Sequence, residues 1–184
     1  KLTVTTIATR NLKFFDDLGR ILGRDFLKIV YFDDLLAVQL CGLVKNVLAV
    51  LCGIVEGLEM GRNTFAFLTM KGIGEITNLC RVLGCNGDVI LTPAGIGDLV
   101  LTCTSHSSRN MSFGYRVGCG EKIEKILENP GTTVEGLSNA KNLYSMSKKF
   151  GLKGTLAELL LKIIDGSFDR EELSKTIVEG LLQK

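Results

Sequence analysis

The feature that most restricts the fold of this chain is a long apolar run, from Leu35 to Val55, with a lysine and an asparagine at its centre. Its length meets the requirement of about 20 residues for a helix that crosses a bilayer. Lys45 and Asn46 would then lie in mid-membrane, where a lysine alone costs about 2.5 to 3.5 kcal/mol. We therefore predict a buried helix of a soluble protein and no transmembrane segment.

The residues before this helix have the pattern of a strand, a helix and a strand. LTVTTIA and FLKIVYF, at 2–8 and 26–32, are rich in β-branched and aromatic residues, and NLKFFDDLGRIL between them has apolar residues at helical spacing. From Asp33 onward the periodic segments are helical. The sequence predicts a mainly α fold, with the tail end of an α/β domain in residues 1–32 and an all-α domain in residues 33–184.

Start and stop signals divide the rest of the chain into helices. A second helix is expected from Asn63 to Gly84, and Pro93 then interrupts the chain before a helical AGIGDLVLTCT and a polar SHSSRN loop. EGLSNAKNLYSMSKKF and TLAELLLKIID are amphipathic, as is DREELSKTIVEGLLQK. Asp169, with Glu172 three residues on, suits the start of the last of these helices.

Charge and cysteine content exclude several classes of partner. The 22 Lys and Arg residues nearly balance 20 Asp and Glu residues, so the net charge of +2 gives no reason to expect a nucleic acid partner. The six cysteines form no Cys-x-x-Cys pair and the single histidine is His106, so zinc-site spacings are absent and no metal is expected. Free thiols of this kind are typical of a reducing cytosol, which predicts a cytoplasmic location.

Lys45 has the surroundings of a functional lysine. On a helix, the residues three and four positions away are small or apolar: Cys41, Gly42, Leu48 and Ala49. Burial disfavours the ammonium form of a lysine and makes the amine a usable proton acceptor near neutral pH. The alternative is a lysine that extends from the helix flank to solvent. Asn46, equally out of character in this run, favours the functional interpretation.

Asp98 lies in the apolar segment PAGIGDLVLTCT, and Thr102 follows it by four residues. On a helix this spacing places the carboxylate and the hydroxyl on one face. A buried aspartate needs a partner, and Lys45 is the obvious cation for it. Taken alone, Asp98 is equally explained as a helix cap after Gly95 and Gly97.

The run SSRN combines a planar cation with the N-terminus of an expected helix. Arg109 offers five N–H donors, and Ser108 and Asn110 flank it where free backbone amides are expected. This combination suits a phosphate group; the alternative is a surface arginine beside a capping serine. A triad of Ser108, His106 and Asp98 is discounted because no nucleophile elbow is present.

The Gly-Ile-Gly triplets at 72–74 and 95–97 do not indicate a cofactor loop. Neither has the G-x-G-x-x-G form, and neither follows a strand. The sequence therefore contains no dinucleotide fingerprint.

Three motifs together resemble a known family. VQLCGLVKNVLAVLCGIVEGLEMGRNT, then PAGIGDLVLTCTSHSSRN followed by FG, then TTVEGLSNA are similar, in this order and at these separations, to the C-terminal half of the bacterial NAD(P)-dependent glycerol-3-phosphate dehydrogenases. The resemblance covers essentially the whole chain. It implies a domain like the C-terminal domain of 6-phosphogluconate dehydrogenase, preceded by the end of a Rossmann domain.

The resemblance also implies a reaction. In this family dihydroxyacetone phosphate is reduced to sn-glycerol 3-phosphate, a precursor of phospholipids, with NAD or NADP as the cofactor. Lys45 matches the catalytic lysine that exchanges a proton with the C2 oxygen, and Asp98 and Thr102 match positions that orient it. The substrate-binding positions implied are Lys45, Asn46, Asp98, Ser108, Arg109 and Asn110, and the cofactor-binding positions are Arg109, Thr133 and Glu135.

Departures from the family pattern and alternatives remain. Lys71 stands where the family usually has an arginine, which leaves a structural ion pair there in doubt. The family's Gly-rich loop would lie upstream of Lys1, so we expect the isolated chain to be an inactive fragment. Its exposed sheet edge could promote pairing, such as a homodimer, or aggregation, and the sequence leaves the oligomeric state open. The alternatives are a helical interaction module without catalysis and a related reductase that acts on a non-phosphorylated hydroxy acid.

Overall fold

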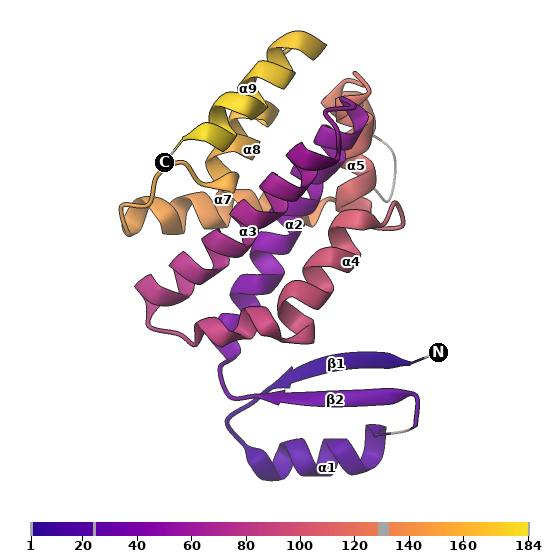
Figure 1. Ribbon diagram of the computed structural model, residues 1–184, viewed down its shortest axis with the longest axis vertical. Helices are drawn as coiled ribbons and strands as arrows, with labels where there is room; N and C mark the ends of the chain where they lie inside the picture. The colour runs from indigo at the N-terminus through magenta and orange to yellow at the C-terminus, as the bar shows by residue number, and fades with distance from the viewer. Residues whose placement is uncertain (1, 24, 129–132, 184) are drawn as a thin grey trace.

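The computed structural model describes residues 2–23, 25–128 and 133–183, and these ranges are mostly helical. Figure 1 shows a thin layer of two strands and one helix beneath a larger body of helices. The layer consists of β1 (Thr3–Ala8), α1 (Leu12–Leu22) and β2 (Leu27–Phe32). The body consists of α2 (Leu35–Gly57), α3 (Arg62–Leu83), η1 (Gly87–Leu91), η2 (Pro93–Gly97), α4 (Asp98–Thr104), α5 (Arg109–Gly118), α6 (Ile123–Leu127), α7 (Glu135–Lys149), α8 (Leu156–Asp165) and α9 (Arg170–Leu182). The expected mainly α fold is confirmed.

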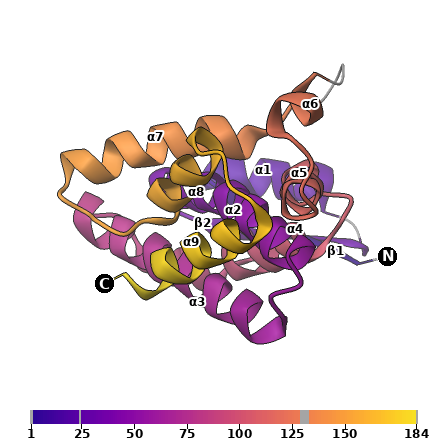
Figure 2. The ribbon, with the colours of Figure 1, turned by 90° about the horizontal axis from the view of Figure 1, so that it is seen from above.

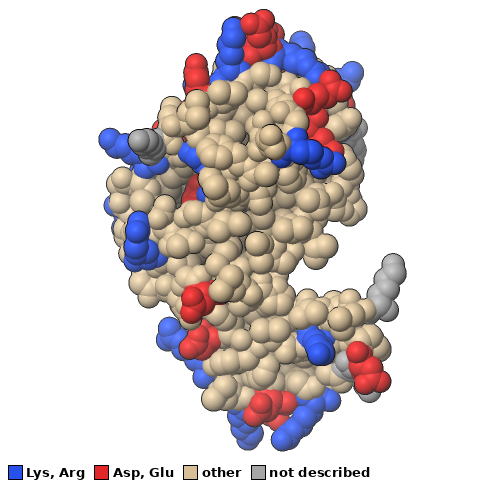
Figure 3. Space-filling view, in the orientation of Figure 1, with Lys and Arg blue, Asp and Glu red and all other residues tan. Residues whose placement is uncertain are grey.

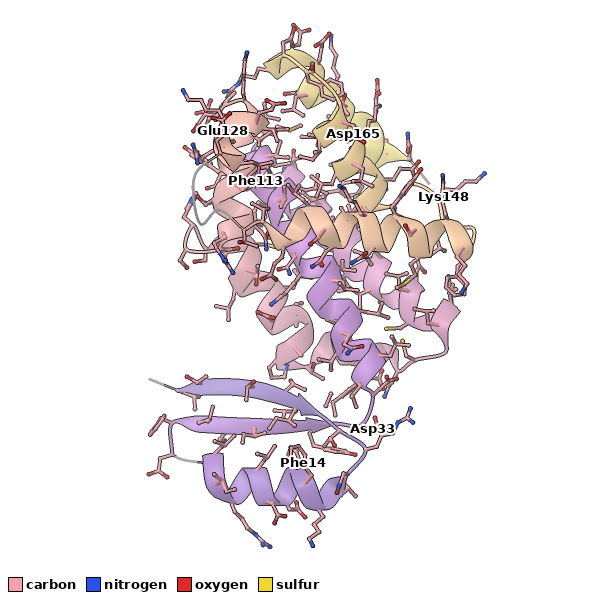
Figure 4. The ribbon with its side chains drawn as sticks, turned by 180° about the vertical axis from the view of Figure 1, so that it is seen from behind. Phe14, Asp33, Phe113, Glu128, Lys148 and Asp165 are labelled. Carbon is pink, nitrogen blue, oxygen red and sulfur yellow. The ribbon has the colours of Figure 1, made fainter. Side chains whose placement is uncertain are left out.

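The N-terminal layer is a β-α-β unit, as the sequence predicts. β1 and β2 are parallel, beginning with Thr3 beside Leu27, and α1 connects them. The side chain of Asn11 caps α1 by accepting a hydrogen bond from the backbone N–H of Phe14 at 3.0 Å. No residue of α1 is buried, and Phe14, labelled in Figure 4, remains half exposed. Two strands and one helix are too few to bury the apolar side chains of this unit.

Asp34 anchors the passage from β2 to α2. Asp33, labelled in Figure 4, and Asp34 are the only residues between these elements. The Asp34 carboxylate accepts one hydrogen bond from the N–H of Ala37, which caps α2, and another from the N–H of Asn86 at 2.8 Å. The hydrogen bond from Asn86 lowers the pKa of Asp34. The start of α2 is thereby fixed against the turn that follows α3.

The core of the molecule is α2. Its residues from Val44 to Val55 are almost all buried, and it contacts α3, α4, α5, α7 and α8. Figure 2 shows α2 in the middle of the bundle. Among the described residues, α2 is the one helix long and apolar enough to cross a membrane, but 61% of its most apolar window is buried inside the protein. This is the burial of a core helix, as the sequence predicts.

Glycines bring α5 into direct backbone contact with α2. Gly53 and Gly57 on α2 face Gly114 and Gly118 on α5, and the two members of each pair are four positions apart. A Cβ atom added to Gly114 would lie 2.0 Å from the carbonyl oxygen of Val50, where no real Cβ fits. The two helices can therefore pack at this distance only with glycine at the contact.

The helix boundaries agree closely with the sequence signals. α3 begins at Arg62, one residue before the expected Asn63, and Gly84 ends it in the left-handed conformation. Asp169 and Glu172 form a complete capping box at the start of α9. The short elements α6 and η1 were not expected, because segments of five residues carry too little periodicity to be recognised.

Lys71 and Glu75 lie four residues apart on α3 but do not pair. The Lys71 ammonium donates a hydrogen bond to the carbonyl oxygen of Gln183 at 2.7 Å. Glu75 accepts a hydrogen bond at Oε2 from the N–H of Leu156 at 2.8 Å, at the start of α8, while its buried Oε1 has no hydrogen-bond partner among the described residues. Burial raises the pKa of Glu75 to about 7. Within the described residues, Lys71 is thus engaged by a backbone carbonyl and forms no ion pair with Glu75.

All six cysteines lie in the described part of the chain and are free thiols, as expected. Most of them are buried, among them Cys41 on α2, where burial raises the pKa of the thiol to about 11. Such a thiol stays protonated at neutral pH and behaves as a small apolar side chain.

Candidate active site

Lys45 and Asp98 form an ion pair in which the Lys45 ammonium donates a hydrogen bond to Asp98 Oδ2. The Lys45 side chain is only 23% exposed and comes from the centre of α2, and Asp98 is the first residue of α4. Thr102, one turn further along α4, donates a hydrogen bond from Oγ1 to Asp98 Oδ1 at 3.3 Å. The three residues singled out in the sequence are therefore in contact, and both oxygens of the carboxylate are used.

The turn before α4 directs the Asp98 carboxylate toward α2. Thr92 caps η2, and Gly95 approaches the preceding turn so closely that a Cβ would lie 2.3 Å from the carbonyl oxygen of Val89. Gly97, and not Asp98, occupies the N-cap position of α4, and no side chain caps this helix. The interpretation of Asp98 as a helix cap is therefore wrong, and its carboxylate is available for Lys45.

A cavity of about 520 Å³ adjoins Asp98 between the strand layer and the helical body. The N–H of Ala94 donates a hydrogen bond to Thr6 Oγ1 at 3.2 Å, which holds β1 against η2 at this point. Figure 3 shows the hollow between the two parts of the molecule, with walls that are mostly uncharged. The lining residues are Val4, Thr5, Thr6, Pro93, Ala94, Gly97, Asp98 and Leu101. The role of Thr6 was missed in the sequence because a threonine in a strand has no distinguishing signal.

Asn46 connects α2 to α5 and α7. Its Oδ1 accepts a hydrogen bond from Asn110 Nδ2 at 3.0 Å, and its Nδ2 donates to Glu135 Oε2 at 3.2 Å. The Oδ1 atom of Asn110 accepts from the N–H of Gly136 at 2.9 Å. Asn46 and Asn110 are both buried, and their hydrogen bonds satisfy groups that would otherwise be costly to bury. Gly136 was missed in the sequence; a Cβ there would lie 2.7 Å from the carbonyl oxygen of Asn46.

Arg109 begins α5 and lies at the edge of this network. Its guanidinium is 3.5 Å from Glu135 Oε1, and both side chains are largely exposed. Ser108 caps α5 by accepting a hydrogen bond from the N–H of Met111 at 3.4 Å. With Asn110 engaged by α2 and α7, Arg109 and the first backbone amides of α5 are the groups that remain for an anion.

Thr133 and His106 do not join the Lys45 pair. Thr133 is exposed two residues before α7, next to residues 129–132, which lie outside the described ranges. His106 pairs with Glu56 and not with Ser108 or Asp98, so the described residues contain no Ser-His-Asp triad. Within residues 2–23, 25–128 and 133–183, no group of three or more metal-ligating side chains is gathered.

The comparisons with known proteins agree on one family. A family model described as "NAD-dependent glycerol-3-phosphate dehydrogenase C-terminus" matches residues 34–175. The chain is 34% identical to glycerol-3-phosphate dehydrogenase [NAD(P)+] of Pseudoalteromonas translucida, over 96% of this chain and 53% of that protein. It is 36% identical to the protein of the same name from Legionella pneumophila (strain Corby), over 92% of this chain and 52% of that protein.

A solved structure extends the likeness to three dimensions. The crystal structure of glycerol-3-phosphate dehydrogenase from Coxiella burnetii has a TM-score of 0.90 at 32% identity, and the match covers 99% of this chain and 55% of that one. The fold is thus that of one half of a nicotinamide-dependent dehydrogenase. The chain belongs to the NAD-dependent glycerol-3-phosphate dehydrogenase C-terminal family. It spans about half the length of the curated relatives that it matches.

The polar groups near α5 and α7 fit the edge of a nicotinamide dinucleotide. The Arg109 guanidinium is exposed and suits a phosphate, and the Glu135 carboxylate is exposed and suits hydroxyl donors. The described residues include no glycine-rich phosphate loop after a strand. These side chains suit one side of such a cofactor, and the described residues supply no glycine-rich loop for its pyrophosphate.

Proposed function

We propose that this chain forms the substrate-side half of a glycerol-3-phosphate dehydrogenase that reduces dihydroxyacetone phosphate to sn-glycerol 3-phosphate with NADH or NADPH. The observation that carries the proposal is the pair of Lys45 and Asp98 beside the cavity, in a chain of this family. The product is a precursor of phospholipids. The free thiols support a cytoplasmic location.

Lys45 acts as the proton donor in the reductive direction. A bound nicotinamide cofactor supplies a hydride to the substrate carbon C2. The Lys45 ammonium gives its proton to the C2 oxygen, and the neutral amine takes the proton back in the oxidative direction. Asp98 holds the ammonium in place, and the hydrogen bond from Thr102 fixes the rotation of the Asp98 carboxylate.

The substrate phosphate binds at the start of α5. Arg109 supplies the charge, and the backbone amides of the first turn of this helix supply donors without intrahelical partners. Ser108 contributes its hydroxyl, while Asn110 and Asn46 act on the substrate through the shape that their hydrogen bonds give to this loop. Arg109, Thr133 and Glu135 would contact the cofactor when it is bound.

The alternatives receive less support. An interaction module without catalysis requires Lys45 and Asp98 to face a protein partner, whereas Asp98 lines a cavity. A reductase for a non-phosphorylated hydroxy acid leaves the Arg109 guanidinium without an anionic ligand.

The test is reduction of dihydroxyacetone phosphate by the full-length protein, followed by the loss of NADH or NADPH absorbance. Unphosphorylated dihydroxyacetone serves as the matched substrate. We expect kcat/KM for the phosphorylated ketone to exceed that for dihydroxyacetone by at least about a hundredfold, because a charge-assisted bidentate contact contributes several kcal/mol. Equal rates with the two ketones would contradict the proposal, as would the absence of turnover with either coenzyme.

A further inference from the structure

His106 lies in the loop that leads to the proposed phosphate site, yet none of the groups assigned above uses it. The loop joins α4, which ends at Thr104, to α5, which begins at Arg109. The same loop therefore connects the helix of Asp98 with the helix of Arg109. Any contact that holds the loop also holds the start of α5 relative to α4.

Two contacts hold the His106 side chain. Its Nε2 is 3.5 Å from Glu56 Oε1, an ion pair when the imidazole is protonated. Its ring meets the Tyr115 ring edge to face, with centroids 5.3 Å apart and an interplanar angle of 89°. Glu56 belongs to α2 and Tyr115 to α5, so the single histidine connects the loop to both helices.

Glu56 and Tyr115 are themselves held in a fixed relation. Glu56 precedes Gly57 on α2, and a Cβ on Gly57 would lie 2.4 Å from the carbonyl oxygen of Tyr115. The backbones of α2 and α5 are therefore in contact at this level. Glu56 and Tyr115 cannot move apart unless the two helices separate. His106 is the more exposed partner of the pair, with its side chain 58% exposed against 34% for that of Glu56.

The rest of the loop has only local support. Ser105 and Ser107 share a hydrogen bond between their hydroxyl groups at 2.6 Å, and the N–H of Ser108 donates to the carbonyl oxygen of Ser105 at 2.9 Å. These bonds set the turn but do not attach it to another helix. Among the described residues, the ion pair between this loop and another helix is that of His106 with Glu56.

We propose that His106 is a positioning residue for the phosphate site. It holds the Ser105–Ser108 loop against α2 through its contact with Glu56 and against α5 through its contact with Tyr115. The inference rests on the proposed function, because it takes Ser108 and Arg109 as phosphate ligands. Without these contacts, a smaller fraction of the molecules has the loop in place before the ligand binds, so the apparent affinity for phosphate falls in proportion to that fraction.

The experiment uses the full-length protein with the variants His106→Ala, Glu56→Gln and the double variant. We expect each single variant to raise KM for dihydroxyacetone phosphate about fivefold, and to leave kcat within about twofold, because the interaction is the same in the ground state and the transition state. The inhibition constant of inorganic phosphate should rise by the same factor. The double variant should be no worse than His106→Ala alone, because that substitution already removes the contact with Glu56.

Matched variants distinguish the loss of the His106 contacts from a general effect of charge or folding. Glu59→Gln removes a carboxylate at the same end of α2 that pairs with Arg170 and not with the loop, so it should leave KM unchanged. Tyr115→Phe keeps the ring and should also leave KM unchanged, whereas Tyr115→Leu should raise it. Circular dichroism checks that each variant is folded.

The outcomes of this experiment are distinct from those that test the proposed function. Unchanged KM and phosphate inhibition in both single variants would overturn the positioning role of His106, and so would full additivity in the double variant. If the parent protein does not reduce dihydroxyacetone phosphate, the proposed function fails. Calorimetric titration of the parent and variants with inorganic phosphate then still decides whether His106 positions the loop: equal affinities overturn it.

Discussion

The ammonium of Lys45 and the carboxylate of Asp98 meet across 53 residues of sequence, from the middle of the most buried helix to the first turn of another. An ion pair of this kind contributes little to the stability of a fold, because the Asp98 side chain is 41% exposed and solvent screens the attraction. Its position beside a cavity gives it a chemical use instead.

Replacement of Lys45 tests that use directly. We expect Lys45→Met to lower kcat for reduction of dihydroxyacetone phosphate by about a hundredfold or more, since a positioned acid or base contributes about 10²- to 10⁴-fold. Lys71→Met is the control, because Lys71 donates to the carbonyl oxygen of Gln183 on another face of the body. Steady-state kinetics on both variants give the comparison, and a near-normal kcat for Lys45→Met would remove this residue from the reaction.

The buried amide of Asn110 should matter mainly to stability. Asn110→Ala leaves the N–H of Gly136 and the Oδ1 of Asn46 without partners, and each such loss costs about 1 to 3 kcal/mol. We expect the free energy of unfolding to fall by about 2 kcal/mol or more in urea denaturation. Ser138→Ala removes an exposed hydrogen bond to Glu135 on the same helix and should change stability by less than about 0.5 kcal/mol. Similar free energies of unfolding for the two variants would show that the hydrogen bonds of Asn110 do not contribute to stability.

Two glycines, one on α5 and one on α2, should respond in opposite directions. Gly114→Ala places a methyl group 2.0 Å from the carbonyl oxygen of Val50, so the helices must separate, and we expect a loss of about 3 kcal/mol or more. Gly42→Ala, in the interior of α2 with no atom within 4 Å of the added Cβ, should stabilise the protein by about 0.5 to 1 kcal/mol. Thermal unfolding measures both, and a stabilised Gly114→Ala variant would contradict the close contact.

Glu75 makes stability depend on pH. Its pKa is about 7 in the fold against 4.5 for an ordinary glutamate, so the folded state binds more protons than the unfolded state between these values. Stability from this group is therefore fully present below about pH 4.5 and is lost as the pH rises through 7, by about 3 kcal/mol in all.

The variant Glu75→Gln should remove this dependence. Because glutamine resembles the protonated acid, the variant should match the parent protein near pH 5 and exceed it in stability at pH 8. Urea unfolding at the two values measures the difference. If the parent and the variant lose stability in parallel as the pH rises, the carboxyl of Glu75 is not the group responsible.

The sequence alone was sufficient for much of this description. The apolar run around Lys45 and Asn46 predicts the buried helix, Asp169 with Glu172 predicts the start of α9, and the spacing of Asp98 and Thr102 places them on one face. These are local properties: a cap or a helical period involves residues within a few positions of one another, and their preferences are written in the residues themselves.

Contacts between distant segments were decided only by the tertiary structure. Whether Asp98 caps its own helix or pairs with Lys45 depends on where the η2 turn directs α4, and whether Asn110 faces a ligand or the interior depends on how closely Gly136 approaches it. The contacts of His106 with Glu56 and Tyr115 likewise could not be predicted from the sequence. A hydrogen bond or a close glycine contact requires two surfaces at once, and only packing of the whole chain brings those surfaces together.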